Sequence, residues 1–452
     1  MLKRICLTTL FIANFLDHTS AFKLGFSPSL TNKSIFDQTD PDVNKSFKQI
    51  VEDNGFVFES HLVTTRDGYE LKMFRIPGSR LELTLNETNG YRKTHNKLVN
   101  TKKLNKKVVL MQHGIFDSAD CWISNTKEKS PAFILSKQGY DVWLGNSRGN
   151  KYSNGHEDPF ITQQEFNDYS FQEMGDYDIP AMLQYIEQYT SQKKVAYIGH
   201  SQGTAQMFYA LATNQEYFKD RISVFAALGP ITALKAEQSF FLSMFRKNVE
   251  LIMKWSKTFG VYDMLQPNFF SKISSQLFCG HIPDLCIIGG FFSDDNLELI
   301  NDVTRVGVYF SHYPSGSSIR SMEHFSQLKN TGKFMTFDFG KERNLEEYGQ
   351  EEPFEIPIEK ITEIPIAMFV GTNDKLATQS DNAFARDIMK DGVKFYKEYP
   401  LGHLAFFTAI DMSYFQQDVV DILKTYHNAV VPKKQVLQEE EFEETIEKFL
   451  GE

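Results

Sequence analysis

Cysteine, excess positive charge and long apolar runs are all scarce in this chain, and each scarcity excludes a class of protein. Only 4 Cys occur in 452 residues, which excludes a small scaffold built on disulfides. The net charge of −10 argues against electrostatic binding of nucleic acid by the whole protein. Beyond the N-terminus no apolar run has the length of a membrane span, so we expect no transmembrane segment in the mature protein.

The length and the aromatic residues are the features that stand out instead. A chain of 452 residues holds one large catalytic domain with insertions, or two or three ordinary domains, and it buries a core without a metal or disulfide. Its 40 Phe indicate either a Phe-rich core or apolar surface kept for a ligand. Composition alone favours the core.

Residues 1–21 have the three parts of a secretory signal peptide. Lys3 and Arg4 form a basic start, residues 5–16 are apolar, and residues 19–21 are small enough for a cleavage site. The alternative is a buried N-terminal helix, which fits the three-part pattern less well. The sequence therefore predicts entry into the secretory pathway, with an extracellular or lysosomal destination.

Two further features agree with an oxidising, glycosylating compartment. Asn32, Asn44 and Asn86 each begin an Asn-X-Ser/Thr sequon and are candidate glycosylation sites. Cys279 and Cys286 are seven positions apart and could form a disulfide around a short loop, the alternative being buried thiols.

Short apolar segments alternate with helical ones over much of the chain. Strands are predicted at 108–111, 140–144, 195–198, 224–228, 366–370 and 393–396, and helices at 178–189 and 204–212. A hairpin is predicted over 61–74, with its turn at Asp67-Gly68. Such alternation is typical of an α/β protein with a mostly parallel sheet and helices on both faces.

A long insertion separates the strands at 224–228 and 366–370. Residues 240–255 have apolar side chains at helical spacing, whereas 341–363 are acidic, contain proline and are expected to be irregular and exposed. We therefore expect a mainly helical cap or lid inside one α/β domain. The predicted division is a signal peptide at 1–21, the α/β core at 22–230 and 364–432, the cap insertion at 231–363, and an acidic tail at 433–452.

The segment Gly199-His-Ser-Gln-Gly203 places a serine between a predicted strand and a predicted helix. A Gly-X-Ser-X-Gly pattern in that position is typical of a nucleophile elbow, a sharp turn that raises the serine hydroxyl above the sheet. The helix N-terminus that follows favours negative charge on a reacting oxygen. The pattern predicts that Ser201 is a catalytic nucleophile.

A serine nucleophile requires a base and an acid that orients the base. In hydrolases with such a sheet, the acid and then the histidine follow the serine in the chain. Asp374 follows the strand at 366–370 and His403 follows the strand at 393–396, so both fall at carboxyl ends of strands, where such sheets build their sites. Two other carboxylates compete less well for the role of the acid. Asp381 lies in a segment whose pattern predicts a helix, and Asp411 comes after the histidine in the chain.

The loop after the first parallel strand is where a second donor to the reacting oxygen is expected. The backbone N–H groups of Ile115 and Gln202 are therefore predicted to form an oxyanion hole. His113, in the same loop, is expected to be structural rather than catalytic.

These motifs, taken together, resemble those of one family. They are Asp67-Gly-Tyr69, Gln112-His-Gly114, Gly139 to Asn150, Gly199 to Thr204, Ser311-His-Tyr-Pro314, His324 with Gln327, and Gly332-Lys-Phe334. The chain resembles the acid lipases of the α/β-hydrolase fold, the group that contains the gastric and lysosomal acid lipases. It departs from them at Ala405, where the family usually has Asp, in the basic loop at 92–107, and in the cysteine spacing of the insertion.

The resemblance implies a triad of Ser201, Asp374 and His403 under an insertion that covers an apolar acyl pocket. The expected reaction is hydrolysis of neutral lipid esters, triacylglycerols or steryl esters, at a lipid–water interface, without a metal or organic cofactor. The alternatives are a general carboxylesterase and a non-catalytic binding protein of the same fold. Nucleic acid is not an expected partner.

Overall fold

Most strands of the computed structural model form one large mixed sheet. The structure describes residues 40–83, 104–266 and 301–428. The strands of this sheet are β1 (Glu59–Thr64), β2 (Tyr69–Ile76), β3 (Val108–Gln112), β4 (Asp141–Leu144), β5 (Gly155–His156), β6 (Val195–His200), β7 (Ile222–Leu228), β10 (Ile366–Gly371) and β11 (Val393–Tyr399). Their order is β1-β2-β4-β3-β6-β7-β10-β11, with β5 paired to β2.

Strand direction divides the sheet into two parts. β2 pairs antiparallel with β1 on one side and with β4 on the other, and the predicted hairpin at 61–74 is confirmed. From β4 through β3, β6, β7 and β10 to β11 every pairing is parallel. The carboxyl ends of these parallel strands therefore lie at one edge of the sheet, where the predicted site residues follow them.

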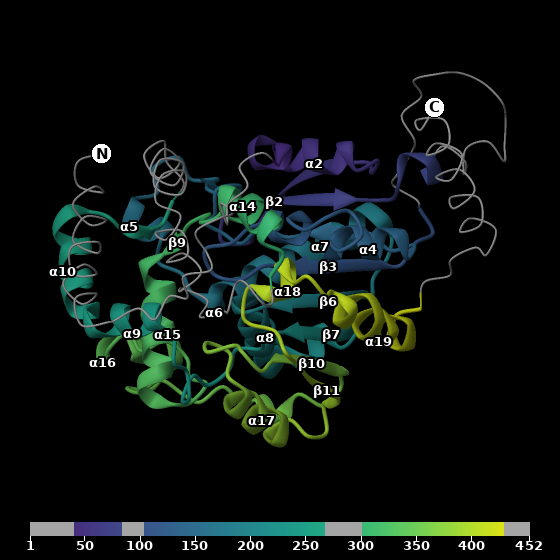
Figure 1. Ribbon diagram of the computed structural model, residues 1–452. Coiled ribbons are helices and arrows are strands. Elements are labelled where there is room, and N and C mark those ends of the chain that lie inside the picture. The colour runs from purple at the N-terminus through teal and green to yellow at the C-terminus, as the bar shows by residue number, and fades with distance from the viewer. Residues whose placement is uncertain (1–39, 84–103, 267–300, 429–452) are drawn as a thin grey trace, which may run out of the picture.

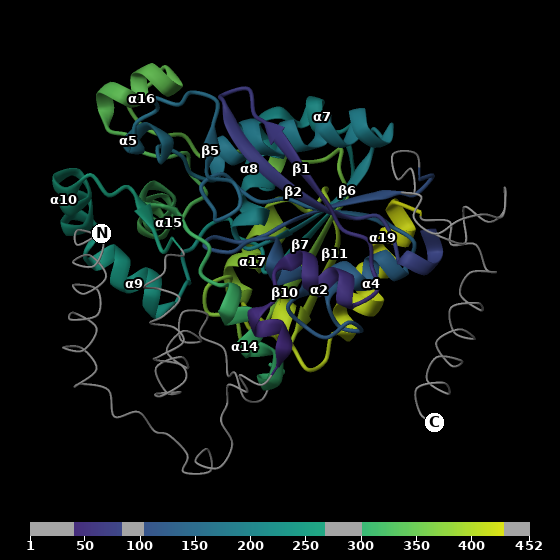
Figure 2. The same ribbon diagram turned by 90° about the horizontal axis from the view of Figure 1, so that it is seen from above.

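Helices cover both faces of the sheet, as the sequence predicts. One face carries α7 (Ile179–Thr190), α8 (Gln202–Phe218) and α17 (Gln379–Ile388), and the other carries α2 (Phe47–Asp53), α4 (Pro131–Lys137) and α19 (Val420–Tyr426). Figure 2 shows α7 and α8 on the opposite side of the sheet from α2 and α4. Successive strand residues alternate between the two cores: Leu110 packs under the first set of helices and Val109 under the second.

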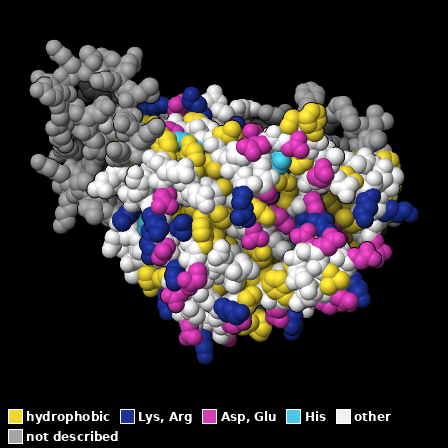
Figure 3. Space-filling view, turned by 180° about the vertical axis from the view of Figure 1, so that it is seen from behind, with side chains coloured by type: hydrophobic (Ala, Val, Ile, Leu, Met, Phe, Trp, Pro, Cys, Tyr) yellow, Lys and Arg dark blue, Asp and Glu magenta, His cyan; other side chains and the backbone are white. Residues whose placement is uncertain are grey.

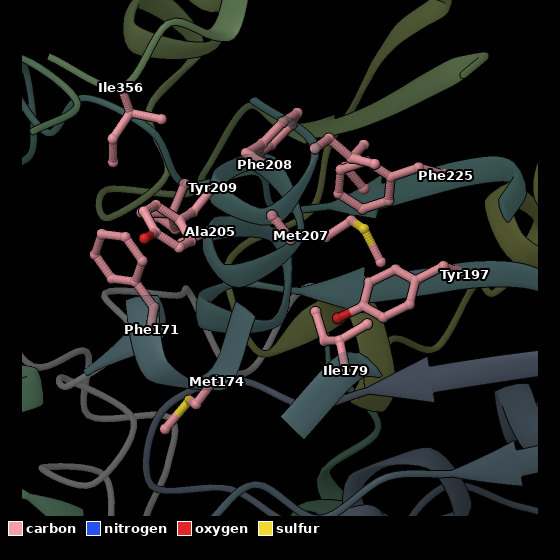
Figure 4. Close-up of a cluster of buried hydrophobic side chains, with 14 of the residues drawn as sticks. Phe171, Met174, Ile179, Tyr197, Ala205, Met207, Phe208, Tyr209, Phe225 and Ile356 are labelled. Carbon is pink, nitrogen blue, oxygen red and sulfur yellow. The ribbon is translucent and has the colours of Figure 1, made fainter. Parts of the chain in front are cut away.

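The core under α8 is rich in aromatic rings. Figure 4 shows Phe208 of α8 close to Phe225 of β7, and their ring centroids are 4.9 Å apart. Phe225 also contacts Tyr197 of β6, with centroids at 5.6 Å. These residues are buried, so they hold α8, which begins directly after Ser201, in a fixed position on the sheet.

The insertion between β7 and β10 is mainly helical in the part that the structure describes. Its elements are α9 (Phe240–Lys247), α10 (Val249–Phe259), β8 (Asp263–Met264), α14 (Val303–His312), β9 (Ser317–Ser318), α15 (Ile319–Thr331), α16 (Lys341–Tyr348) and η6 (Ile358–Lys360). β8 and β9 pair with each other and not with the large sheet. Figure 1 shows α9, α10, α15 and α16 at one end of the molecule.

Residues 240–255 are helical, as their apolar spacing indicates, and form two helices that meet at Asn248, whose side-chain amide donates to the carbonyl of Met244 at 2.8 Å at the end of the first helix. One prediction for this insertion needs correction. Residues 341–348 form the helix α16 and are not irregular. Asn344 is buried and bonds to Asp338 and to the carbonyl of Glu351, so tertiary contacts stabilise a helix that the acidic composition does not indicate.

The remaining short elements connect the core. They are η2 (Pro41–Asn44), η4 (Ala119–Ile123), α5 (Gln163–Phe166), α6 (Phe171–Glu173), the π-helical turn η5 (Met174–Asp178), α18 (Ala405–Thr408) and the π-helical turn η7 (Tyr414–Val419). The helix predicted at 178–189 is confirmed as α7, and the π-helical turn η5 directly precedes it. Among the described helices, none combines the length and the apolar character needed to cross a membrane.

Candidate active site

Ser201 lies in a sharp turn between β6 and α8. Its backbone has φ 53° and ψ −120°, a strained conformation for a residue with a side chain. A Cβ on Gly199 would lie 2.5 Å from the carbonyl oxygen of Gly203, and a Cβ on Gly203 would collide with the carbonyl oxygen of Gln112. Both positions therefore require glycine, and the turn has the geometry of a nucleophile elbow.

Asp374 and His403 are bonded to each other, although 29 positions separate them. Nδ1 of His403 lies 2.7 Å from Oδ2 of Asp374, and both side chains are buried. Oδ1 of Asp374 accepts the backbone N–H groups of Leu376 and Ala377 at 2.9 and 2.7 Å. The carboxylate acts as an acceptor on both oxygens, so the imidazole proton is on Nδ1 and Nε2 is left as the basic nitrogen.

The two competing carboxylates have other partners. Asp381 lies in α17, as predicted, and accepts the backbone N–H of Ala236 and the hydroxyl of Thr378. Asp411 is exposed and accepts the backbone N–H of Ser413. The bonds to Thr378 and Ser413 are local, the bond to Ala236 joins α17 to the segment after β7, and none of them involves a histidine, so the geometry favours Asp374 as the partner of His403.

Gly229, at the end of β7, brings the elbow and the Asp374–His403 pair into one place. A Cβ on Gly229 would lie 3.4 Å from Oδ2 of Asp374 and 3.4 Å from Nδ1 of His403. The preceding residue, Leu228, accepts the backbone N–H of Ser201 at 3.1 Å. The parallel pairing of β6, β7, β10 and β11 therefore places Ser201, Asp374 and His403 at the same edge of the sheet.

The segment 113–118, which we call the β3 loop, passes directly beside the elbow. A Cβ on Gly114 would lie 3.0 Å from Cβ and 3.4 Å from Oγ of Ser201. Nε2 of His113 accepts the backbone N–H of Ser147 at 3.1 Å, so its proton is on Nδ1, which donates to the carbonyl of Gly114 at 2.7 Å. Burial lowers the pKa of His113 to about 4, which keeps the ring neutral.

The hydrogen bond from Nδ1 of His113 to the carbonyl of Gly114 sets the direction of a backbone donor. The carbonyl of Gly114 and the N–H of Ile115 belong to one planar peptide unit and point in opposite directions. Because His113 holds the carbonyl, it also holds the N–H of Ile115. Gln202 is the first residue of α8, so its N–H lacks an acceptor within the helix. His113 is thus structural, as predicted, but it acts on the loop expected to carry an oxyanion donor.

His200 is a residue to which the sequence assigned no role. Its Nε2–H donates to the carbonyl of His403 at 2.9 Å, and the two rings lie with centroids 4.7 Å apart. Burial holds the pKa of His200 well below its ordinary value, and the neighbouring His403 adds to this effect. No local pattern could reveal this contact, because its two partners are 203 residues apart in the chain.

Of the predicted glycosylation and disulfide residues, only Asn44 lies among the residues that the structure describes. Asn44 is exposed in η2, as a glycosylation acceptor must be. Asn32, Asn86, Cys279 and Cys286 lie outside the described residues, as do the predicted signal peptide and the acidic tail. Within 40–83, 104–266 and 301–428, the His, Cys, Asp and Glu side chains form no group of three or more suited to a metal ion.

Comparison with protein families identifies the fold and the class. A family model described as "alpha/beta hydrolase fold" matches residues 107–410, and one described as "Partial alpha/beta-hydrolase lipase region" matches residues 47–126. The chain belongs to the lipases of the α/β-hydrolase family. The fold class and the family resemblance predicted from the sequence are confirmed, and this lipase is a hydrolase.

Curated relatives of this lipase cover most of its length. It is 34% identical over 353 residues to Lipase lipl-3 of Caenorhabditis elegans, which covers 76% of this chain and 82% of that protein. It is 34% identical over 378 residues to the gastric triacylglycerol lipase of Rattus norvegicus, covering 82% and 89%. It is 33% identical over 397 residues to the lysosomal acid lipase/cholesteryl ester hydrolase of Homo sapiens, covering 86% and 92%.

Proposed function

We propose that this lipase hydrolyses carboxylic esters of neutral lipids through an acyl-enzyme formed on Ser201. The observation that carries the proposal is the buried bond of 2.7 Å between His403 and Asp374, beside a strained serine in an elbow. The imidazole of His403 carries its proton on Nδ1, so that Nε2 is the basic nitrogen, and the backbone of Ser201 has the strained conformation of a nucleophile elbow. This combination suits acyl transfer rather than a merely structural role.

The proposed reaction uses groups of the chain in a fixed order. Nε2 of His403 takes the hydroxyl proton of Ser201 as the oxygen attacks the ester carbonyl, and Asp374 stabilises the imidazolium that forms. The N–H groups of Ile115 and Gln202 donate to the tetrahedral oxyanion. His403 then gives its proton to the leaving alcohol, and water deacylates Ser201 by the same steps.

The substrate class is supported by the relatives and by the insertion. The names of two relatives specify triacylglycerol and cholesteryl ester. In this chain the proposed cap consists of the insertion at 231–363, and its helices carry apolar side chains. Leu242, Phe245 and Ile252 are buried, and Leu251 of α10 is exposed. Apolar side chains of this kind fit an acyl chain or a lipid surface. A secretory route, to the cell exterior or the lysosome, accords with the gastric and lysosomal relatives.

A substrate panel tests the proposal. Emulsified triacylglycerol, emulsified cholesteryl ester and a short soluble ester are compared across pH, with Ser201→Ala as the blank. We expect turnover of at least one emulsified lipid, with a higher rate above the concentration at which an interface forms. Activity confined to the soluble ester would indicate a general carboxylesterase.

A fluorophosphonate label tests the non-catalytic alternative separately. We expect the wild-type chain to be labelled at Ser201 and Ser201→Ala to remain unlabelled. Near-wild-type turnover by a folded Ser201→Ala chain would contradict the assigned nucleophile, since its loss costs several orders of magnitude in rate.

A further inference from the structure

The insertion bonds to three consecutive residues of the β3 loop. Tyr309, on α14, donates its hydroxyl proton to Oδ2 of Asp117 at 2.8 Å. Ser315, in the turn after α14, donates its backbone N–H to the carbonyl of Phe116 at 2.6 Å and its hydroxyl to Oγ of Ser118 at 3.1 Å. The loop beside Ser201 is therefore tied to a part of the chain almost 200 residues away.

The β3 loop has a strained residue at the point where the insertion contacts it. Phe116 has φ 60°, in the left-handed region that side chains other than glycine rarely adopt. Such a conformation costs on the order of 1 kcal/mol or more and persists where surrounding contacts enforce it. The hydrogen bond from the backbone N–H of Ser315 to the carbonyl of Phe116 is one of the contacts that enforce this conformation.

Burial makes these bonds effective. Asp117, Ser118, Tyr309 and Ser315 are all buried. The other oxygen of Asp117 accepts the backbone N–H of Ser118 at 2.8 Å, so the carboxyl group joins the loop backbone to α14. In such surroundings the loss of one donor leaves a buried acceptor unsatisfied, and the loop must move to find another.

We propose that Tyr309 and Ser315 are positioning residues for the reaction, holding the β3 loop so that the N–H of Ile115 meets the oxyanion. The N–H of Ile115 belongs to the 114–115 peptide unit, which lies one unit before the peptide that joins Ile115 to Phe116. A change in the backbone of Phe116 therefore reaches this donor through Ile115. The proposal rests on the proposed function, because it requires an oxyanion to form at Ser201. On this view the insertion completes the stabilisation of the transition state as well as covering the site.

Tyr309→Phe is the test, because it removes one oxygen and keeps the ring. Tyr313→Phe is the matched control, since its ring stacks on that of Tyr309 with centroids 5.4 Å apart and it takes the same change. We measure kcat and KM on a soluble p-nitrophenyl ester, per active site titrated with a fluorophosphonate. We also measure Ki for an alkyl trifluoromethyl ketone, which adds to a serine and forms an oxyanion.

We expect Tyr309→Phe to lower kcat by about 10- to 100-fold and to raise Ki by a similar factor, with KM unchanged, because a misplaced donor acts only on the oxyanion. Tyr313→Phe should keep the wild-type values. Values for Tyr309→Phe within about twofold of wild type, or equal losses in Tyr313→Phe, would overturn the proposal. Titration of sites removes unfolded protein from the comparison.

The same measurements distinguish loss of the proposed function from loss of the positioning role alone. A wild-type chain that the ketone does not inhibit, together with an active Ser201→Ala chain, would refute the proposed function itself. A wild-type chain that is active and inhibited, beside an unaffected Tyr309→Phe chain, would refute only the positioning role.

Discussion

The side chain of Asp374 makes three hydrogen bonds, and together they decide what His403 can do. Two backbone N–H groups hold one oxygen, and Nδ1 of His403 donates to the other. The carboxylate cannot rotate without losing a partner, so the imidazole is held in one tautomer. In the proposed reaction the role of Asp374 is orientation and charge stabilisation rather than proton transfer.

Asp374→Asn tests that role. An Asn amide in place of the carboxylate would stabilise the other tautomer, and we expect kcat to fall by about 10³- to 10⁴-fold with little change in folding. Asp381→Asn is the matched control, because Asp381 is a buried acceptor for Ala236 and Thr378 and should leave kcat unchanged. Steady-state kinetics on one ester decides between them. A greater loss in Asp381→Asn would reassign the acid.

Local sequence patterns identified Ser201, Asp374 and His403, but they did not identify the residues around them. The catalytic candidates follow strands and obey a known order, and both properties are visible in one dimension. His200 and Gly229 act through contacts with His403 across the sheet. Such contacts exist only after β6, β7 and β10 have paired, so no spacing rule could locate them.

At the scale of elements, the elbow depends on how closely α8 approaches β3. Gly203 is in the first turn of α8, and a Cβ there would lie 2.8 Å from the carbonyl oxygen of His113 and closer still to that of Gln112. Both obstacles are backbone atoms, which cannot move aside as a side chain does. The helix and the strand would have to separate.

Gly203→Ala should therefore be strongly destabilising, by about 2–4 kcal/mol in the free energy of unfolding, through this overlap. Gly349→Ala is the control, because Gly349 ends α16 with φ 71° and has open space around it. Its cost should be only about 1 kcal/mol of backbone strain. Urea denaturation of both variants gives the comparison. Equal losses would show that backbone strain, not overlap, dominates.

Elements were predicted well where the hydrophobic pattern was strong and poorly where it was weak. The strands β3, β6 and β10 were found because each is a short apolar run, buried on both faces. β11, at the edge of the sheet, contains charged residues and is mostly not buried. The helical pattern continues across Asn248, so it predicts helical structure there without showing that two helices meet. The helix α16 was missed because Asn344 and its tertiary partners, rather than an apolar stripe, support it.

At the scale of the whole molecule, the net charge says little about the substrate. Residues 341–363 hold eight acids and three bases, and residues 439–452 hold seven acids and one base. The negative charge of these two segments together is larger than the net −10 of the whole chain. The rest of the chain is close to neutral. Figure 3 shows acidic and basic side chains interspersed over the described part of one face, as this balance requires.

Asp117 makes the stability of the molecule depend on pH. Burial raises the pKa of Asp117 to about 7, above its ordinary value of 3.8. The folded chain therefore binds this proton more tightly than the unfolded chain, and the free energy of unfolding falls as pH rises between these two values. Above pH 7 the loss is complete, so this carboxyl group favours the folded state in acid.

Asp117→Asn should remove this dependence, because the amide does not titrate. The free energy of unfolding of the variant minus that of the wild type should therefore increase as pH rises from 4 to 8, by an amount on the order of 2–4 kcal/mol. Asp421→Asn, at an exposed carboxyl group, should show no such gain. Denaturant midpoints at pH 4, 6 and 8 provide the measurement. Parallel curves for Asp117→Asn and wild type would contradict the raised pKa.

The sequence by itself determined the α/β class, the elbow serine, the order of the acid and the histidine, and the family. Each of these depends on residues close together in the chain or on their order along it. Only the tertiary structure decided which atoms meet: the bond from His403 to Asp374, the support of His403 by His200, and the ties from Tyr309 and Ser315 to the β3 loop. The reason is physical, since a hydrogen bond requires contact within about 3 Å, and distant residues reach that separation only when the sheet and the insertion have packed.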